Sequence, residues 1–255
     1  MRRFGLGLIA AIVCLLPLAP AAYAVGEQME LKEVEWPHHG PFGTYDRAAL
    51  QRGFLVYQQV CSTCHALQYM AFRNLEQIGL TEDEVKVIAA GYQVTDGPDD
   101  SGETFERPGR PSDPFPAPYP NENAARAANG GAAPPNLSLI VKAREGHEDY
   151  VYSLLTGYTE PPADVEVRPG LYFNPYFPGE QLAMPPPLSE GIVTYPDGTE
   201  ATVEQMAHDV TSFLAWAGEP MLEERKQLGV EVVLFLVLFA GLMYAVKRKV
   251  WAAVH

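Results

Sequence analysis

Two cysteines stand three positions apart at Cys61 and Cys64, and His65 follows the second one directly. The third cysteine of the chain, Cys14, lies far upstream in an apolar N-terminal run. The three clustered side chains can hold a disulfide, a zinc ion or a haem. Each of these would constrain the surrounding chain in a different way, so the motif limits the fold more than any other feature.

The context of the motif separates the three alternatives. Redox disulfides of this spacing follow a strand in a βαβ pattern, whereas a helical pattern precedes Cys61. Zinc needs four ligands, usually with a second close Cys or His pair, and the other histidines are scattered. A c-type haem uses all three residues, two as thioethers and His65 as an axial ligand. The motif therefore favours a covalent haem.

The methionines are the candidates for a sixth iron ligand. Met184 stands in a loop stiffened by Pro185 to Pro187, and such a loop can hold a thioether on iron at low entropic cost. Most of the others lie in the C-terminal apolar run, on or beside predicted helices, or close in sequence to His65. Methionine opposite histidine raises the reduction potential and leaves no open site, which predicts electron transfer. The candidates are Met29, Met70, Met184, Met206, Met221 and Met243.

The N-terminus has the features of an export signal. Arg2 and Arg3 precede an apolar run from Leu6 to Leu18, and Ala22 to Ala24 matches the small-x-small cleavage pattern. Residues 1–24 are therefore predicted to be a signal peptide. Export would also place the two cysteines where haem attachment takes place.

The C-terminus predicts a membrane anchor. Leu228 to Val246 contains a single charge, Glu231, and is long enough as a helix to cross the hydrocarbon layer. Lys247 to Lys249 follow at once, and by the positive-inside rule they predict a cytoplasmic C-terminus. We expect three segments: the signal peptide at 1–24, an exported haem domain at 25–219, and an anchor helix with a short tail at 220–255.

The exported part is acidic. The chain has a net charge of −14, and loss of Arg2 and Arg3 with the signal makes it −16. Such a domain repels nucleic acid and anionic lipid and suits a basic protein partner. The charge by itself is equally consistent with a role in solubility alone.

Hydrophobic periodicity predicts a mainly helical domain without convincing strand alternation. Proline-rich and glycine-rich stretches are predicted to be irregular surface loops. These loops are Thr95 to Asn136, with a short helix at Ala124 to Ala128, and Gly170 to Leu188. Helices are predicted at Asp46 to Val60, Thr81 to Gly91, Glu148 to Thr156 and Thr202 to Trp216, and from Pro220 onward.

Longer blocks of sequence carry a family resemblance. They are "GPFGTYDRAALQRGFLVYQQVCSTCHAL", "APPNLSLIVKAREGHEDYVYSLLTGY" and "GLYFNPYFPGEQLAMPPPL". The chain resembles the cytochrome c1 family, the haem subunits of cytochrome bc1 complexes. The resemblance implies a mainly α, cytochrome c-like haem domain with long loop insertions and one C-terminal transmembrane helix.

The resemblance also implies roles for single residues. It places haem c on Cys61 and Cys64, with His65 and Met184 as the iron ligands. Arg144 falls where the family has an arginine against a haem propionate. The implied haem-pocket walls are Asn129, Ala132, Pro135, Tyr150, Leu154, Leu155 and Phe177.

The function implied is electron transfer without substrate chemistry. The partners would be cytochrome b, a Rieske iron–sulfur protein and a soluble c-type cytochrome, in a dimeric complex of a bacterial inner membrane with the haem domain on the periplasmic side. Two alternatives are an anchored cytochrome that serves a terminal oxidase or reaction centre, and a haem enzyme or sensor with an open axial site. A zinc-binding docking module is a further one.

Overall fold

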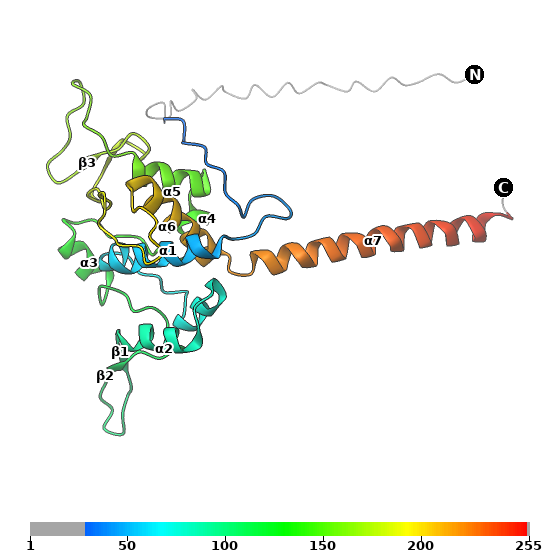
Figure 1. Cartoon of the computed structure of the whole chain (residues 1–255), viewed down its shortest axis with the longest axis horizontal. Helices are drawn as coiled ribbons and strands as arrows, with labels where there is room; N and C mark the ends of the chain where they lie inside the picture. The colour runs from blue at the N-terminus through cyan, green and yellow to red at the C-terminus, as the bar shows by residue number, and fades with distance from the viewer. Residues whose placement is uncertain (1–28, 254–255) are drawn as a thin grey trace, which may run out of the picture.

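The computed structural model describes residues 29–253 and is mainly helical, as predicted (Figure 1). The predicted signal peptide at 1–24 lies outside the described residues. The α-helices are α1 (Arg47–Gln59), α2 (Glu82–Ala90), α3 (Glu122–Ala128), α4 (Ile140–Ala143), α5 (His147–Thr156), α6 (Val203–Gly218) and α7 (Leu222–Trp251). Short 3-10 helices are η1 (Cys61–Thr63), η2 (Phe72–Ile78) and η3 (Leu137–Leu139).

The core is built around α1 and α6, which pack against each other. Leu50 and Phe54 of α1 and Phe213 of α6 are buried at this contact, and the rings of Phe54 and Phe213 lie 5.7 Å apart between centroids. A helix in this position is buried on most sides, and α6 indeed buries nearly its whole length. The helix that leads into the cysteine motif is thus held by the centre of the domain.

A glycine and an ion pair set how closely α1 and α6 approach. A Cβ atom on Gly53 would lie 2.0 Å from the carbonyl oxygen of Asp209, so only glycine fits there. Next to it, the Arg52 guanidinium donates to both carboxylate oxygens of Asp209 at 2.8 and 3.1 Å. Asp209 is completely buried, and this bidentate pairing supplies the partner that a buried carboxylate needs.

The prediction that Thr95 to Asn136 is an irregular surface loop, apart from one short helix, is wrong in two respects. β1 (Gln93–Asp96) and β2 (Phe105–Pro108) form an antiparallel hairpin, which projects from the domain in Figure 1. Its strands are mostly exposed on both faces, so they show no apolar alternation. Beyond the hairpin, Phe115 is buried in the core. The short helix predicted in this segment is present as α3.

The segment from Gly170 to Leu188 also contains a small hairpin that was not predicted. β3 (Tyr172–Phe173) pairs antiparallel with β4 (Gln181–Leu182). Two-residue strands give no periodicity, and the prolines around them indicated a loop. The hairpin leads directly into the proline-rich loop with Met184.

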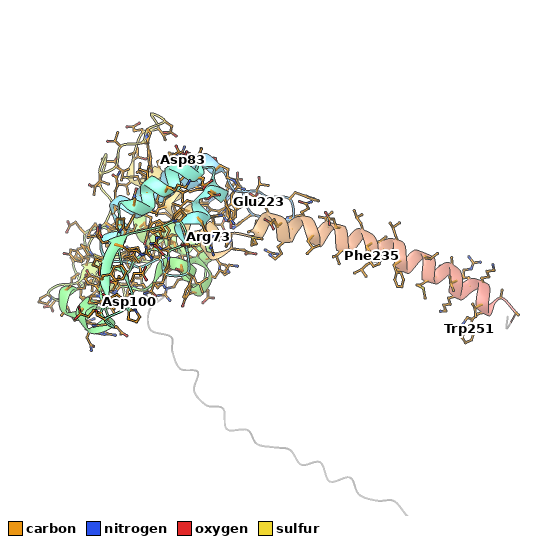
Figure 2. The ribbon with its side chains drawn as sticks, turned by 90° about the horizontal axis from the view of Figure 1, so that it is seen from below. Arg73, Asp83, Asp100, Glu223, Phe235 and Trp251 are labelled. Carbon is orange, nitrogen blue, oxygen red and sulfur yellow. The ribbon has the colours of Figure 1, made fainter. Side chains whose placement is uncertain are left out.

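The last helix, α7, projects away from the domain (Figure 2). It begins at Leu222 instead of the predicted Pro220, because the amide of Leu222 donates to Glu219 in a turn that includes the proline. From Gln227 to Trp251 its residues are exposed, and among the described residues it is the one helix long and apolar enough to cross a membrane. At 1.5 Å per residue it is about 45 Å long.

Candidate haem site

The two cysteines lie at the end of α1, where the chain turns tightly. The amides of Cys64 and His65 both donate to the carbonyl of Cys61, at 3.1 and 2.8 Å. Both thiols are half-buried and free, so they are not joined in a disulfide. Burial raises the pKa of the Cys61 thiol to about 12. The turn thus presents two reduced sulfurs beside one imidazole.

The protonation of His65 is set by a backbone carbonyl. Its Nδ1 lies 2.8 Å from the carbonyl oxygen of Pro135. A carbonyl oxygen only accepts, so Nδ1 carries the hydrogen and the lone pair is on Nε2. Burial lowers the pKa of His65, which keeps the ring neutral at physiological pH. A neutral imidazole with a free Nε2 is the form that binds iron.

Further hydrogen bonds hold the His65 segment against the segment that begins at Pro135. The amide of Leu137 donates to the carbonyl of Ala66 at 2.9 Å, and the amide of Tyr69 donates to the buried Oγ of Ser138 at 3.1 Å. These bonds join two parts of the chain that are about 70 residues apart in the sequence. The Pro135 carbonyl that orients the imidazole belongs to this second segment. These bonds therefore hold the carbonyl in position relative to His65.

Three of the predicted wall residues lie on α5. Tyr150 is buried in the core cluster, while Leu154 and Leu155 are half-buried at its edge. An apolar surface that remains half-exposed on a core helix is suited to cover a large planar ligand. Phe177 is also half-buried and lies in the β3–β4 turn, where its carbonyl accepts from Glu180.

The predicted wall residues near α3 make local contacts. The side-chain amide of Asn129 donates to the carbonyl of Ala125 at 2.7 Å, and the amide of Ala132 donates to the carbonyl of Asn129. Both residues are half-buried. The structure joins Pro135 to His65 directly, but it gives Asn129 and Ala132 no bond to the motif within the described chain.

Arg144 is an exposed residue that directly follows α4. Burial raises the pKa of Tyr150, and the nearby Arg144 guanidinium opposes this shift through its charge and a hydrogen bond. The structure therefore brings two of the predicted residues together. A guanidinium carries five N–H donors, so Arg144 can pair with an anionic group in addition to Tyr150.

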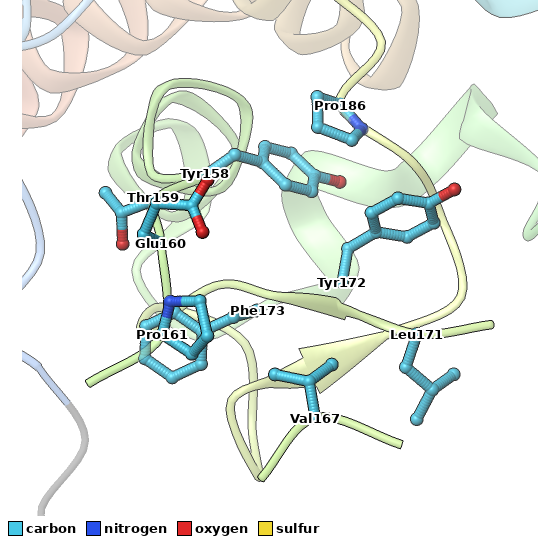
Figure 3. A pocket seen from close by; sticks show the side chains of 9 residues that line it. All are labelled: Tyr158, Thr159, Glu160, Pro161, Val167, Leu171, Tyr172, Phe173 and Pro186. Atoms are coloured by element: carbon cyan, nitrogen blue, oxygen red, sulfur yellow. The ribbon is translucent and has the colours of Figure 1, made fainter. Parts of the chain in front are cut away.

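The methionine loop is tied to the segment after α5. The Tyr158 hydroxyl donates to the carbonyl of Met184 at 3.0 Å. A pocket of about 500 Å³ lies beside this bond, and its lining includes Tyr158, Tyr172, Phe173 and Pro186 (Figure 3). Burial raises the pKa of Tyr158, so its hydroxyl stays protonated and can keep donating.

Two tyrosines that support the site were not among the predicted residues. Tyr158 holds the Met184 backbone, and the Tyr57 hydroxyl donates to the carbonyl of His65 at 3.3 Å. Both stand in the sequence blocks that carried the family resemblance. Nothing in the local sequence indicated that their hydroxyls reach the ligand segments.

The residues present fit a c-type haem. Two free thiols and an imidazole with an unengaged Nε2 lie in one turn, since none of the described residues pairs with that nitrogen. A thioether stands in a loop held by a hydrogen bond, and a cation is available for an acidic group. Together they match the donor set of a His/Met-ligated covalent haem.

Known proteins are similar to this chain over most of its length. The family model described as "Cytochrome C1 family" matches residues 36–254. A cytochrome b/c1 of Bradyrhizobium diazoefficiens is 52% identical over 243 residues, which cover 87% of this chain and 35% of that protein. The mitochondrial haem protein cytochrome c1-2 of Solanum tuberosum is 52% identical over 221 residues, covering 87% of this chain and 85% of that protein. Cytochrome c1 of Rhodospirillum rubrum is 46% identical over 252 residues, covering 92% and 93%. The chain belongs to the cytochrome c1 family.

Proposed function

We propose that this chain is a membrane-anchored mono-haem electron carrier. It would accept electrons from a Rieske iron–sulfur protein and pass them to a soluble c-type cytochrome within a cytochrome bc1 complex. Membership of the cytochrome c1 family supports this role and implies one covalent haem c. The chain spans about a third of the length of the Bradyrhizobium protein, whose name combines cytochromes b and c1.

Each ligand residue has a separate task in this proposal. Cys61 and Cys64 would tether the haem through thioethers, and His65 would bind iron through Nε2. Met184 would be the sixth ligand, and Arg144 would pair with a propionate. When bound, haem c supplies an iron that takes up and releases one electron.

The hydrogen bond from His65 to Pro135 is the observation that carries the proposal. It fixes the tautomer and the ring plane together, so the imidazole does not need to reorganise when the charge on the site changes. An electron carrier needs a ligand held in this way, because electron transfer is faster when the iron ligands move little between the two redox states. Substrate chemistry would instead need an open coordination position.

The anchor and the acidic charge support the rest of the proposal. α7 would cross the inner membrane with Lys247 to Lys249 on the cytoplasmic side, which leaves the haem domain in the periplasm. Cytochrome b would be its neighbour in the membrane, in a dimeric complex. The negative net charge would attract a basic soluble cytochrome.

Three measurements on protein purified in mild detergent test this function. Acid–acetone should leave the haem on the polypeptide, and the pyridine haemochrome spectrum should show two saturated vinyl groups. The chain should also co-elute with a Rieske protein and a cytochrome b. Extractable haem would refute the covalent site, whereas a covalent haem without these two companions would refute the bc1 assignment.

A further inference from the structure

A second group of potential ligands lies outside the haem site, on α5 and on the segment before α1. It comprises His38, His39 and Glu148. The Nε2 of His38 is 3.0 Å from one carboxylate oxygen of Glu148, and the Nε2 of His39 is 3.4 Å from the other. The three ligand atoms all lie within 4.8 Å of one another. None of these residues has a part in holding the haem.

The spacing of these atoms is close to that of a tetrahedral zinc site. Bonds of 2.0 to 2.1 Å at tetrahedral angles separate neighbouring ligand atoms by about 3.3 Å. The two contacts with Glu148, at 3.0 and 3.4 Å, lie on either side of this value and involve the two different oxygens of its carboxylate. Since the three ligand atoms lie within 4.8 Å of one another, a divalent ion can enter once the side chains rotate to bring one carboxylate oxygen near both imidazoles.

Neighbouring residues hold His38 in place before any ion binds. Its side chain is only 3% exposed, and its ring stacks on Tyr45 with centroids 4.7 Å apart. Its carbonyl oxygen accepts from the Lys226 ammonium at the base of α7. A ligand that is already ordered loses little entropy on binding, so these contacts favour metal affinity.

The other two ligands differ in exposure. Glu148 is 13% exposed and lies in the first turn of α5, whereas His39 is 54% exposed. The exposed imidazole offers an entry path and leaves one side of the site open to water. Two histidines and one glutamate with a water molecule form a known three-ligand zinc arrangement.

We propose that His38, His39 and Glu148 bind one divalent transition-metal ion of the zinc class, with water as the fourth ligand. Two imidazoles and one carboxylate suit Zn²⁺ better than Mg²⁺ or Ca²⁺, which prefer oxygen ligands. None of its three ligands is among the residues that would hold the haem.

The site would act as a cross-link between the N-terminal segment and α5. Other contacts already run along this junction: the amide of Lys32 donates to the Oγ of Ser153, and the amide of Val34 donates to Asp149. A bound ion would hold the N-terminal segment and α5 together at the end of this junction that lies nearest α7. Zn²⁺ should therefore raise the temperature at which the domain unfolds.

The test uses the full-length haem-loaded chain in detergent, without a histidine tag. Zn²⁺ titrated by calorimetry should bind with one equivalent per chain. His39→Gln should weaken binding by about tenfold or more, and since His39 is exposed the variant should fold normally. His147→Gln is the matched control, because His147 is an exposed histidine next to Glu148 but outside the group, and its affinity should stay within about twofold of the wild-type value.

Spectroscopy assigns the ligands independently. Zinc X-ray absorption of the loaded protein should show nitrogen and oxygen neighbours with imidazole scattering, and the haem absorption bands should not change. A sulfur shell, wild-type affinity in His39→Gln, or the absence of saturable binding would overturn the proposal. In the last case the group would be an ion pair only.

Discussion

At the scale of single residues, Met184 is the ligand whose role is easiest to test. Met184→Leu removes the thioether but keeps the apolar volume. We expect the reduction potential to fall by on the order of 100 mV or more, within the roughly 0.8 V range that axial ligands span. The reduced variant should also bind carbon monoxide. A redox titration and a carbon monoxide difference spectrum measure both effects.

Met206→Leu is the matched control for this substitution. Met206 is fully buried in α6, so the change should cost less than about 1.5 kcal/mol of stability and leave the potential unchanged. A normal potential in Met184→Leu with a lowered one in Met206→Leu would move the sixth ligand to α6.

Glu148 should make the domain sensitive to acid. Burial acts to raise the pKa of its carboxyl, but the hydrogen bond with His38 and the nearby imidazoles lower it to about 2. The folded pKa is thus below the value of 4.5 for an unfolded chain. The stability from Glu148 is complete above pH 4.5 and is lost as the pH falls toward 2.

Glu148→Gln should remove this part of the acid sensitivity. In chelator-treated protein, the wild type should lose up to about 3 kcal/mol more than the variant between pH 5 and pH 2. Urea unfolding at a series of pH values measures the difference. Glu145→Gln, a change at an exposed neighbour, should follow the wild type, and equal slopes for all three proteins would contradict the assignment.

At the scale of elements, the starts of three helices were predicted well. Asp46, Thr81 and Thr202 stand at predicted helix starts, and the side chain of each accepts hydrogen bonds from the first turn of its helix. These signals act within one turn, so a sequence is sufficient to read them. The haem motif is similar, because its three residues are neighbours in the chain. Bonds such as that from Tyr158 to Met184 join distant segments, and no local pattern encodes them.

Phe115 shows what a local pattern misses. It stands between prolines in a segment without periodicity, yet it is only 2% exposed and its ring lies 4.3 Å from that of Phe72 between centroids. The rings of Phe54 and Tyr57 are also in contact range at 6.1 Å. The segment therefore closes the core under α1, although its composition is that of a surface loop.

Phe115→Ala should cost about 3–5 kcal/mol of stability, because it leaves a cavity among these rings. Replacement of residues 98–103 at the exposed hairpin tip by a short turn should change stability by no more than about 0.5 kcal/mol. Chemical denaturation followed by circular dichroism compares the two variants. A mild effect of Phe115→Ala would mean that the segment is a surface loop after all.

At the scale of the whole molecule, the first turn of α7, the candidate membrane helix, packs with the domain. Leu222 is buried in the core, and both carboxylate oxygens of Glu223 are engaged, one by Arg47 at 2.7 Å and one by the amide of Tyr45 at 2.8 Å. Lys226 donates to the carbonyl of Gly43 at 3.0 Å. The domain boundary predicted between residues 219 and 220 stays a prediction. These contacts indicate that the first turn of α7 contributes to the stability of the haem domain.

Two truncations separate the roles of the turn and the rest of the helix. A chain that ends at Gln227 should be released from the membrane with an unchanged haem spectrum and stability. A chain that ends at Glu219 should also be released but should lose about 2–3 kcal/mol or more, because the burial of Leu222 is lost. Membrane fractionation and thermal unfolding measure the two effects. Equal stability of both chains would show that the turn contributes nothing.

The contacts between the domain and the first turn of α7 make the connection between them rigid instead of flexible. A domain on a flexible linker would rotate freely above the bilayer and present all of its surfaces to other proteins. With α7 in a membrane, as proposed, this domain keeps one height and one tilt. In the proposed complex, the electron donor and the electron acceptor would then have to move to reach the haem domain, because the domain itself keeps its position.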